Sequence, residues 1–140
     1  MAREPQSALA VATRALARRD FSERGLRERL RRAGITSSEA EEALAALLGA
    51  GLVNDGRFAL SRARSLAERG KGDAAIRYDL EEYGVEPGLV AEALEALEPE
   101  AARAERIVAS RGRSATTARF LARKGFGEDA VESAAGEMLG

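Results

Sequence analysis

The chain has 140 residues, of which 22 are basic and 23 acidic, and it has no cysteine and no histidine, which rules out disulfides and Cys/His zinc sites. No stretch approaches the roughly 20 consecutive apolar residues of a membrane-spanning helix, and the N-terminal segment lacks the apolar core of a signal peptide, so we expect a soluble cytoplasmic protein that contacts no membrane. Abundant Ala, Leu, Arg and Glu, with few aromatic and β-branched residues, favour an all-α fold.

The first third of the chain is predicted to form three helices, at about 6–19, 23–33 and 37–49. Ser22 is a good N-cap for the second of them, and Gly34, which is free to adopt positive φ, is expected to end it. Thr36 and Glu39 match a capping box at the start of the third.

The middle of the chain is predicted to form three more helices, at about 56–69, 74–83 and 87–97. Asn54 or Asp55 is expected to cap the first and Asp73 the second. Pro87 falls at the first position of the third, where its missing N–H costs nothing. The glycine-lysine-glycine sequence at 70–72 lacks the strand and the spacing of a phosphate-binding loop, so it is interpreted as a helix–helix turn.

The last third is predicted to form helices at about 100–110, 114–124 and 128–139. Each third contains one copy of a short pattern, a leucine, three residues, a glycine and an apolar residue. The copies are LRRAGI (30–35), LEEYGV (80–85) and LARKGF (121–126).

An alignment on the three glycines places apolar residues at matching offsets. The position thirteen residues after the glycine, for example, is occupied by Leu47, Leu97 and Met138. Offsets of six, nine and thirteen fall on one face of a helix. We therefore predict three tandem three-helix repeats, divided as 1–54, 55–98 and 99–140.

Charge alternates along the chain in blocks. The net charges are +5 for 1–34, −3 for 35–54, +3 for 55–71, −8 for 72–100, +6 for 101–124 and −4 for 125–140. The early helices of the outer repeats are basic and every third helix is acidic, an arrangement that can place one sign of charge on one face of the array.

Arginine and lysine side chains are the candidate binding residues, because they suit phosphates and carboxylates alike. Arg24, Arg27 and Arg31 lie three and four residues apart and therefore share a helix face. For the whole set, an acidic protein or a polyanion is the expected partner. The set is Arg18, Arg19, Arg24, Arg27, Arg31, Arg57, Arg62, Arg69, Lys71, Arg113, Arg119, Arg123 and Lys124.

Catalytic chemistry is not indicated. The absence of histidine removes the commonest general base, and the carboxylate clusters are interpreted as solvated helix faces rather than metal ligands. We expect no enzyme activity, no cofactor and no metal. Aromatic residues are too sparse to indicate stacking on single-stranded bases.

Three segments, 15–35, 51–85 and 120–139, resemble the RecX family of bacterial recombination regulators. They read ALARRDFSERGLRERLRRAGI, GLVNDGRFALSRARSLAERGKGDAAIRYDLEEYGV and FLARKGFGEDAVESAAGEML. The resemblance implies an elongated, curved array of three-helix repeats that lodges in the groove of RecA filaments on single-stranded DNA. It also implies that filament growth, ATPase and strand exchange are inhibited, which modulates recombination and DNA repair.

Two points stay open at the level of sequence. One is direct contact with single- or double-stranded DNA, because trihelical units with a basic second helix also suit an independent DNA-binding protein of helix-turn-helix type. The other is the oligomeric state, for which a monomer is the expectation.

Overall fold

The computed structural model describes residues 7–136, and within that range every regular element is an α-helix. The elements are α1 (Ala8–Arg18), α2 (Glu23–Arg32), α3 (Ser37–Gly49), α4 (Asp55–Glu68), α5 (Asp73–Glu82), α6 (Pro87–Glu95), α7 (Glu100–Arg111), α8 (Ala115–Arg123) and α9 (Glu128–Ala135). The predicted all-α class is confirmed. The first eight helices end within two residues of their predicted bounds, whereas the last helix ends earlier than predicted, at Ala135, because Gly136 leaves the helical conformation. Residue 6 of the first predicted helix and residues 137–139 of the last lie outside the described residues.

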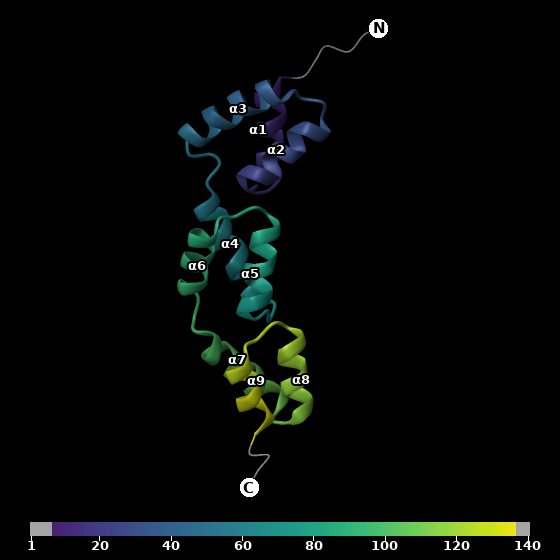
Figure 1. The fold of residues 1–140 in the computed structure, drawn as a ribbon, viewed down its shortest axis with the longest axis vertical. Helices are drawn as coiled ribbons and strands as arrows, with labels where there is room; N and C mark the ends of the chain where they lie inside the picture. The colour runs from purple at the N-terminus through teal and green to yellow at the C-terminus, as the bar shows by residue number, and fades with distance from the viewer. Residues whose placement is uncertain (1–6, 137–140) are drawn as a thin grey trace.

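The helices form three groups of three that follow one another along the long axis of an elongated molecule (Figure 1). Each group has its own apolar core, drawn from α1–α3, α4–α6 and α7–α9. Leu30, Leu80 and Leu121, the leucines of the repeated pattern, are each 0% exposed, one in each core. Met138, the last aligned apolar position, lies outside the described residues. The division at residues 54 and 98 stays a prediction.

Local capping explains where the helices begin. The side chains of Ser22, Thr36 and Asn54 accept hydrogen bonds from backbone N–H groups in the first turns of α2, α3 and α4, as predicted. The prediction that Asp73 caps α5 is wrong, because the N-cap is Gly72 and Asp73 is the first helical residue. Its carboxylate instead contacts an arginine of the next repeat.

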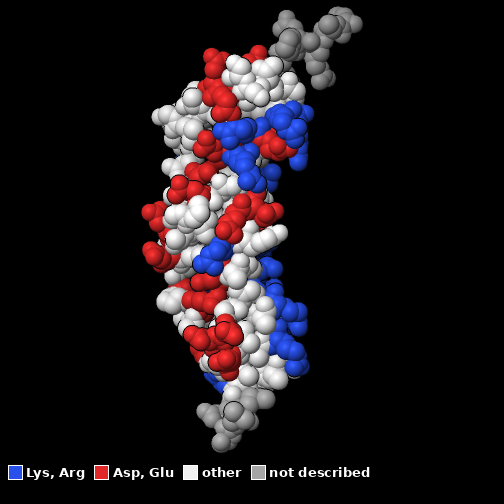
Figure 2. Space-filling model, in the orientation of Figure 1, with Lys and Arg blue, Asp and Glu red and all other residues white. Residues whose placement is uncertain are grey.

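The second helices of the three groups, α2, α5 and α8, lie along one side of the molecule, and α3 and α6 lie on the other (Figure 1). Basic side chains gather near both ends of the α2–α5–α8 side, and acidic side chains spread over the middle and the opposite side (Figure 2). On this face the basic side chains are thus concentrated near the two ends of the α2–α5–α8 side.

Candidate binding surface

The junction between the first two groups is formed by the N-terminus of α2 and the C-terminus of α5. The Ser22 hydroxyl donates to the Tyr83 carbonyl at 2.8 Å, and the Arg24 guanidinium donates to the Glu82 carbonyl at 2.8 Å. The first N–H of α2, that of Glu23, donates to a carboxylate oxygen of Asp55 at 2.7 Å. Ser22 is only 1% exposed, so this contact is part of the interior.

The junction between the second and third groups repeats this geometry. Gly72 N–H, at the start of α5, donates to the Lys124 carbonyl at 2.8 Å, and the N–H of Ala74 donates to the Gly125 carbonyl at 3.1 Å. The Asp73 N–H donates to a carboxylate oxygen of Glu100 at 2.7 Å.

Each junction therefore docks the N-terminus of one second helix on the C-terminus of the next. In both, the first residue of the next repeat's first helix, Asp55 or Glu100, supplies the carboxylate that accepts the leading N–H. Charge-assisted hydrogen bonds of this kind are stronger than neutral ones. They hold the three groups in a defined order along the molecule and so fix where the binding side chains stand.

Arg103 strengthens the second junction from α7. Its guanidinium donates to the Asp73 carboxylate at 2.9 Å and to the Glu98 carbonyl at 3.0 Å, and its carbon atom lies 5.9 Å from the centroid of the Phe126 ring. The residue is 9% exposed. Arg103 belongs by sequence to the basic group of the last repeat, but its burial places it in the junction rather than on the surface.

The candidate arginines of α2 lie together in the first group of helices, but two of them already form ion pairs with carboxylates of the chain. Arg27 pairs with Glu41 at 2.6 Å and Glu23 at 3.2 Å, and Arg31 pairs with Glu28. The hydrogen bond to Glu41 raises the pKa of Arg27, and that from Arg27 lowers the pKa of Glu41.

Glu28 and Arg31 show the same reciprocal effect. Arg31 lowers the pKa of Glu28 by hydrogen bonding to it, and the pKa of Arg31 is raised in turn. Both side chains lie at the surface, so the pair is screened by water. The positive charge that α2 presents to a partner is therefore partly compensated.

The candidate residues of α8 form a second group with a different environment. Arg119 and Arg123 are exposed one turn apart, and neither lies within ion-pair distance of a carboxylate in the part of the chain that the structure describes. The Lys124 amine lies 5.5 Å from the centroid of the Phe120 ring. Arg113, just before the helix, is instead paired with Glu105 at 2.9 Å.

The remaining candidates are spread over α1, α4 and the turn after α4. Arg62 makes a two-point ion pair with Asp79, with distances of 2.6 and 2.9 Å, which raises its pKa. Arg57 donates to the carbonyls that follow α3, at Gly51 and Leu52. The other four have no carboxylate within ion-pair distance among residues 7–136, and they are Arg18, Arg19, Arg69 and Lys71.

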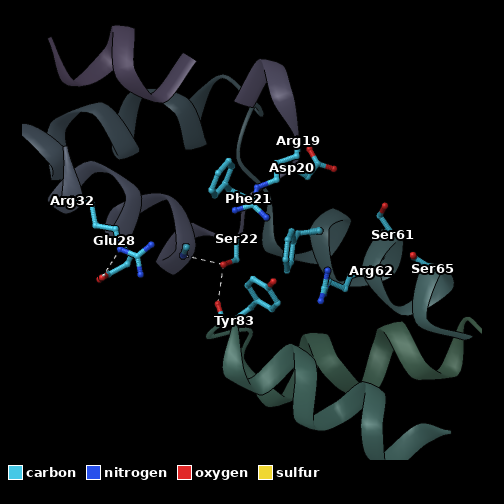
Figure 3. A pocket seen from close by; sticks show the side chains of 12 residues that line it. Arg19, Asp20, Phe21, Ser22, Glu28, Arg32, Ser61, Arg62, Ser65 and Tyr83 are labelled. Carbon is cyan, nitrogen blue, oxygen red and sulfur yellow. Dashed lines mark hydrogen bonds and ion pairs between the residues drawn. The ribbon is translucent and has the colours of Figure 1, made fainter. Parts of the chain in front are cut away.

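A cavity of about 500 Å³ lies beside the first junction, between the α1–α2 connection, α2, α4 and the end of α5 (Figure 3). Phe21, Phe58 and Tyr83 line it, and the last two rings pack edge to face with centroids 5.2 Å apart. The guanidinium carbons of Arg19 and Arg62 lie 4.5 and 4.6 Å from the centroids of the Phe21 and Tyr83 rings. Such a pocket can accept an apolar side chain of a partner. Sequence reasoning missed it, because its walls come from different repeats.

Within residues 7–136, no three Asp or Glu side chains converge in a way that could hold a metal ion. No helix of that range combines the length and the apolar character that crossing a bilayer requires.

Known proteins resemble this chain along most of its length. The family model for the second three-helix domain of RecX matches residues 54–94. The regulatory protein RecX of Halorhodospira halophila is 38% identical over 135 residues, which cover 89% of this chain and 84% of that protein. That of Chromohalobacter salexigens is 39% identical over 132 residues, covering 88% and 87%.

Two solved structures share the fold. The crystal structure of RecX from Lactobacillus salivarius matches with a TM-score of 0.77 at 19% identity and covers 91% of both chains. A crystal structure of regulatory protein RecX matches with a TM-score of 0.76 at 22% identity, over 89% of this chain and 68% of the other. The helical-repeat arrangement is thus one that is already known from solved structures.

Proposed function

The chain belongs to the RecX family of regulatory proteins, and from that premise we propose that it binds RecA filaments on single-stranded DNA and inhibits their growth, ATPase and strand exchange. The family is the first support for this proposal. The second is the shape, because an elongated array suits a partner that is itself a long polymer. In this role the protein acts in the cytoplasm by binding, with no cofactor.

The mechanism that we propose is a contact at two separated places. The basic side chains near the two ends of the α2–α5–α8 side are separated by α5, which holds one basic and four acidic residues. Once one end is bound, the other is held at a high effective concentration near the next subunit, so the two contacts together bind more tightly than either alone. A protein that bridges neighbouring subunits in this way would hinder the movements that growth and ATP turnover require.

The uncompensated charge of α8 is the observation that carries the proposal. Arg119 and Arg123 face solvent without a carboxylate partner among the described residues, whereas Arg27 and Arg31 of α2 are paired. Unpaired guanidinium groups keep their full attraction for acidic protein surfaces and phosphates. We therefore rank α8 above α2 among the candidate contact sites.

The proposal can be tested by titrating this protein into RecA filaments on single-stranded DNA and measuring ATP hydrolysis. Inhibition is expected, and Arg123→Glu should raise the half-inhibitory concentration about tenfold, which corresponds to about 1.4 kcal/mol. Arg64→Glu is the matched control, because Arg64 is also exposed and unpaired among the described residues but lies on α4. Unchanged ATP hydrolysis at saturating wild-type protein would refute the proposed function.

A second candidate function is direct binding to DNA without RecA. It is favoured by the position of Arg119 and Arg123 on the second helix of a three-helix unit, where a major-groove reader would present basic side chains. Fluorescence anisotropy with labelled DNA distinguishes the two functions. Direct binding should persist without RecA and weaken steeply as salt rises.

A further inference from the structure

The glycines that end the three second helices share a left-handed conformation but differ in their surroundings. Their φ angles are +83° at Gly34, +79° at Gly84 and +92° at Gly125. A Cβ atom added at Gly84 would lie 2.7 Å from Arg24, and one added at Gly125 would lie 2.6 Å from Ala75. A Cβ atom added at Gly34 would meet no described atom within 4 Å. The surface that a preceding repeat covers on α5 and α8 is therefore uncovered on α2.

The backbone acceptors show the same difference. At the ends of α5 and α8, carbonyl groups accept the junction hydrogen bonds described above. The carbonyls of Arg32, Ala33 and Gly34 receive no such bond from any residue in the range 7–136, and all three residues are exposed. We call these three residues the open end of α2. Helix-terminal carbonyls need an outside partner, and here that place is accessible to another molecule.

The two helix N-termini that dock within the chain indicate what fits such an end. Both have a small N-cap residue, an acidic first residue and a small third residue. These residues are Ser22, Glu23 and Gly25 on α2 and Gly72, Asp73 and Ala75 on α5. At the second junction the close approach requires small residues, since a Cβ atom at Gly72 would overlap the backbone of Gly125 and Phe126, and Ala75 lies against Gly125.

Charge at the open end favours the same kind of occupant. Arg29, Arg31 and Arg32 lie in the last turn of α2, and the side chains of Arg31 and Arg32 are 71% and 72% exposed. One carboxylate, that of Glu28, contacts both of these two arginines. An acidic residue in the first turn of an incoming helix would meet this excess of positive charge.

A second copy of this chain fits less well. Of the three second helices, only α8 has an N-terminus that does not dock on the end of another second helix within the described chain. It begins with Ala115, which carries no charge. In addition, the first residue of α1 is Ala8, so the carboxylate that Asp55 and Glu100 supply at the internal junctions has no counterpart here. An acidic residue of the occupant would therefore act on Arg31 and Arg32 and would not replace that carboxylate.

We infer that the open end of α2 binds the N-terminal turn of a helix in a protein partner, a turn that carries a small N-cap residue, an acidic first residue and a small third residue. The inference rests on the proposed function, because it takes the RecA filament as the partner that presents this turn. In this arrangement the open end of α2 recognises the shape of one helix terminus of the partner, and α8 attracts the partner by charge alone.

Binding of labelled full-length protein to RecA filaments on single-stranded DNA tests the inference. Ala33→Trp fills the open end from an exposed position and should weaken binding about tenfold or more. Ala50→Trp is the matched control, because Ala50 is the exposed C-cap residue of α3 and also precedes a glycine of positive φ, Gly51. The control should stay within about twofold of wild type, and circular dichroism should show equal helix content in both variants.

Photo-cross-linking supplies an independent readout. With p-benzoylphenylalanine in place of Ala33, we expect cross-links to the first turn of a helix with the small–acidic–any–small pattern. Unchanged filament binding by Ala33→Trp, or cross-links confined to other kinds of segment, would overturn the inference and leave the proposed function intact. Self-association that Ala33→Trp abolishes would assign the open end to a second copy and also overturn it. Failure of the wild-type protein to bind the filament would refute the proposed function and this inference with it.

Discussion

At the scale of single residues, the ion pairs of the first repeat decide which charges can reach a partner. The pKa of Glu41 is lowered by Arg27, so the carboxylate stays ionised to more acidic pH than an isolated glutamate. A carboxyl group with a lowered folded-state pKa stabilises the fold above its unfolded pKa, and this contribution is lost as the pH falls through the folded value. Acidification should therefore release Arg27 only at low pH.

An NMR titration of the Glu41 side chain can measure this effect. The midpoint should lie below the ordinary value of 4.5 in the wild-type protein and return to it in Arg27→Gln, in which the neutral amide keeps some hydrogen-bonding capacity but no charge. Equal midpoints in the two proteins would show that the pair does not persist in solution.

At the scale of the helices, burial of one apolar face explains the stability of each repeat. Leu80 of α5 is 0% exposed and belongs to the core formed by α4, α5 and α6. Such short helices are marginal in isolation, so most of their stability comes from packing. Each repeat depends on a small set of buried apolar side chains that includes at least one fully buried leucine.

Leu80→Ala is expected to lower the free energy of unfolding by about 2–5 kcal/mol, because it removes buried methyl groups and leaves a cavity. Urea denaturation followed by circular dichroism measures the change. Leu52→Ala is the control, because Leu52 is 55% exposed and its replacement should change stability by no more than about 0.5 kcal/mol. A similarly small change for Leu80→Ala would mean that this core is not packed as described.

At the scale of the whole molecule, the two junctions turn three small helical units into one array. Each unit alone is too small to bury a large core, and neighbouring units stabilise one another through their interfaces, as in other repeat proteins. Because the basic groups stand on different repeats, the junctions also set the distance between them. Binding at two places therefore requires that the junctions keep their geometry.

Gly72→Ala should disturb the second junction, since the added methyl group overlaps the end of α8. We expect the repeats to separate there, with a larger radius of gyration in small-angle X-ray scattering and weaker filament binding, while the helix content is retained. Gly49→Ala is the control, because Gly49 ends α3 and an added Cβ atom meets nothing within 4 Å. An unchanged radius of gyration in Gly72→Ala would show that the junction tolerates the methyl group.

The sequence alone determined the features that depend on neighbouring residues. Helix periodicity placed Leu30, Leu80 and Leu121 in the cores, and short-range capping rules identified the start of α2 at Ser22. The same local rules assigned a cap to Asp73, which was wrong because Gly72 is held by the distant end of α8. These rules use spacings of a few residues, which the primary sequence contains directly.

Which charged groups are engaged, and where the repeats meet, depends on contacts between segments that are distant in the sequence. The Ser22 hydroxyl donates to an acceptor 61 residues further along the chain. Arg62 of α4 pairs with Asp79 of α5, 17 residues further along. Arg123 and Arg27 look alike in the sequence, yet only the second is paired with carboxylates in the described structure. The physical reason is that the partner of a long, charged side chain is chosen by proximity in space, and contacts between distant segments leave no periodic pattern in the sequence.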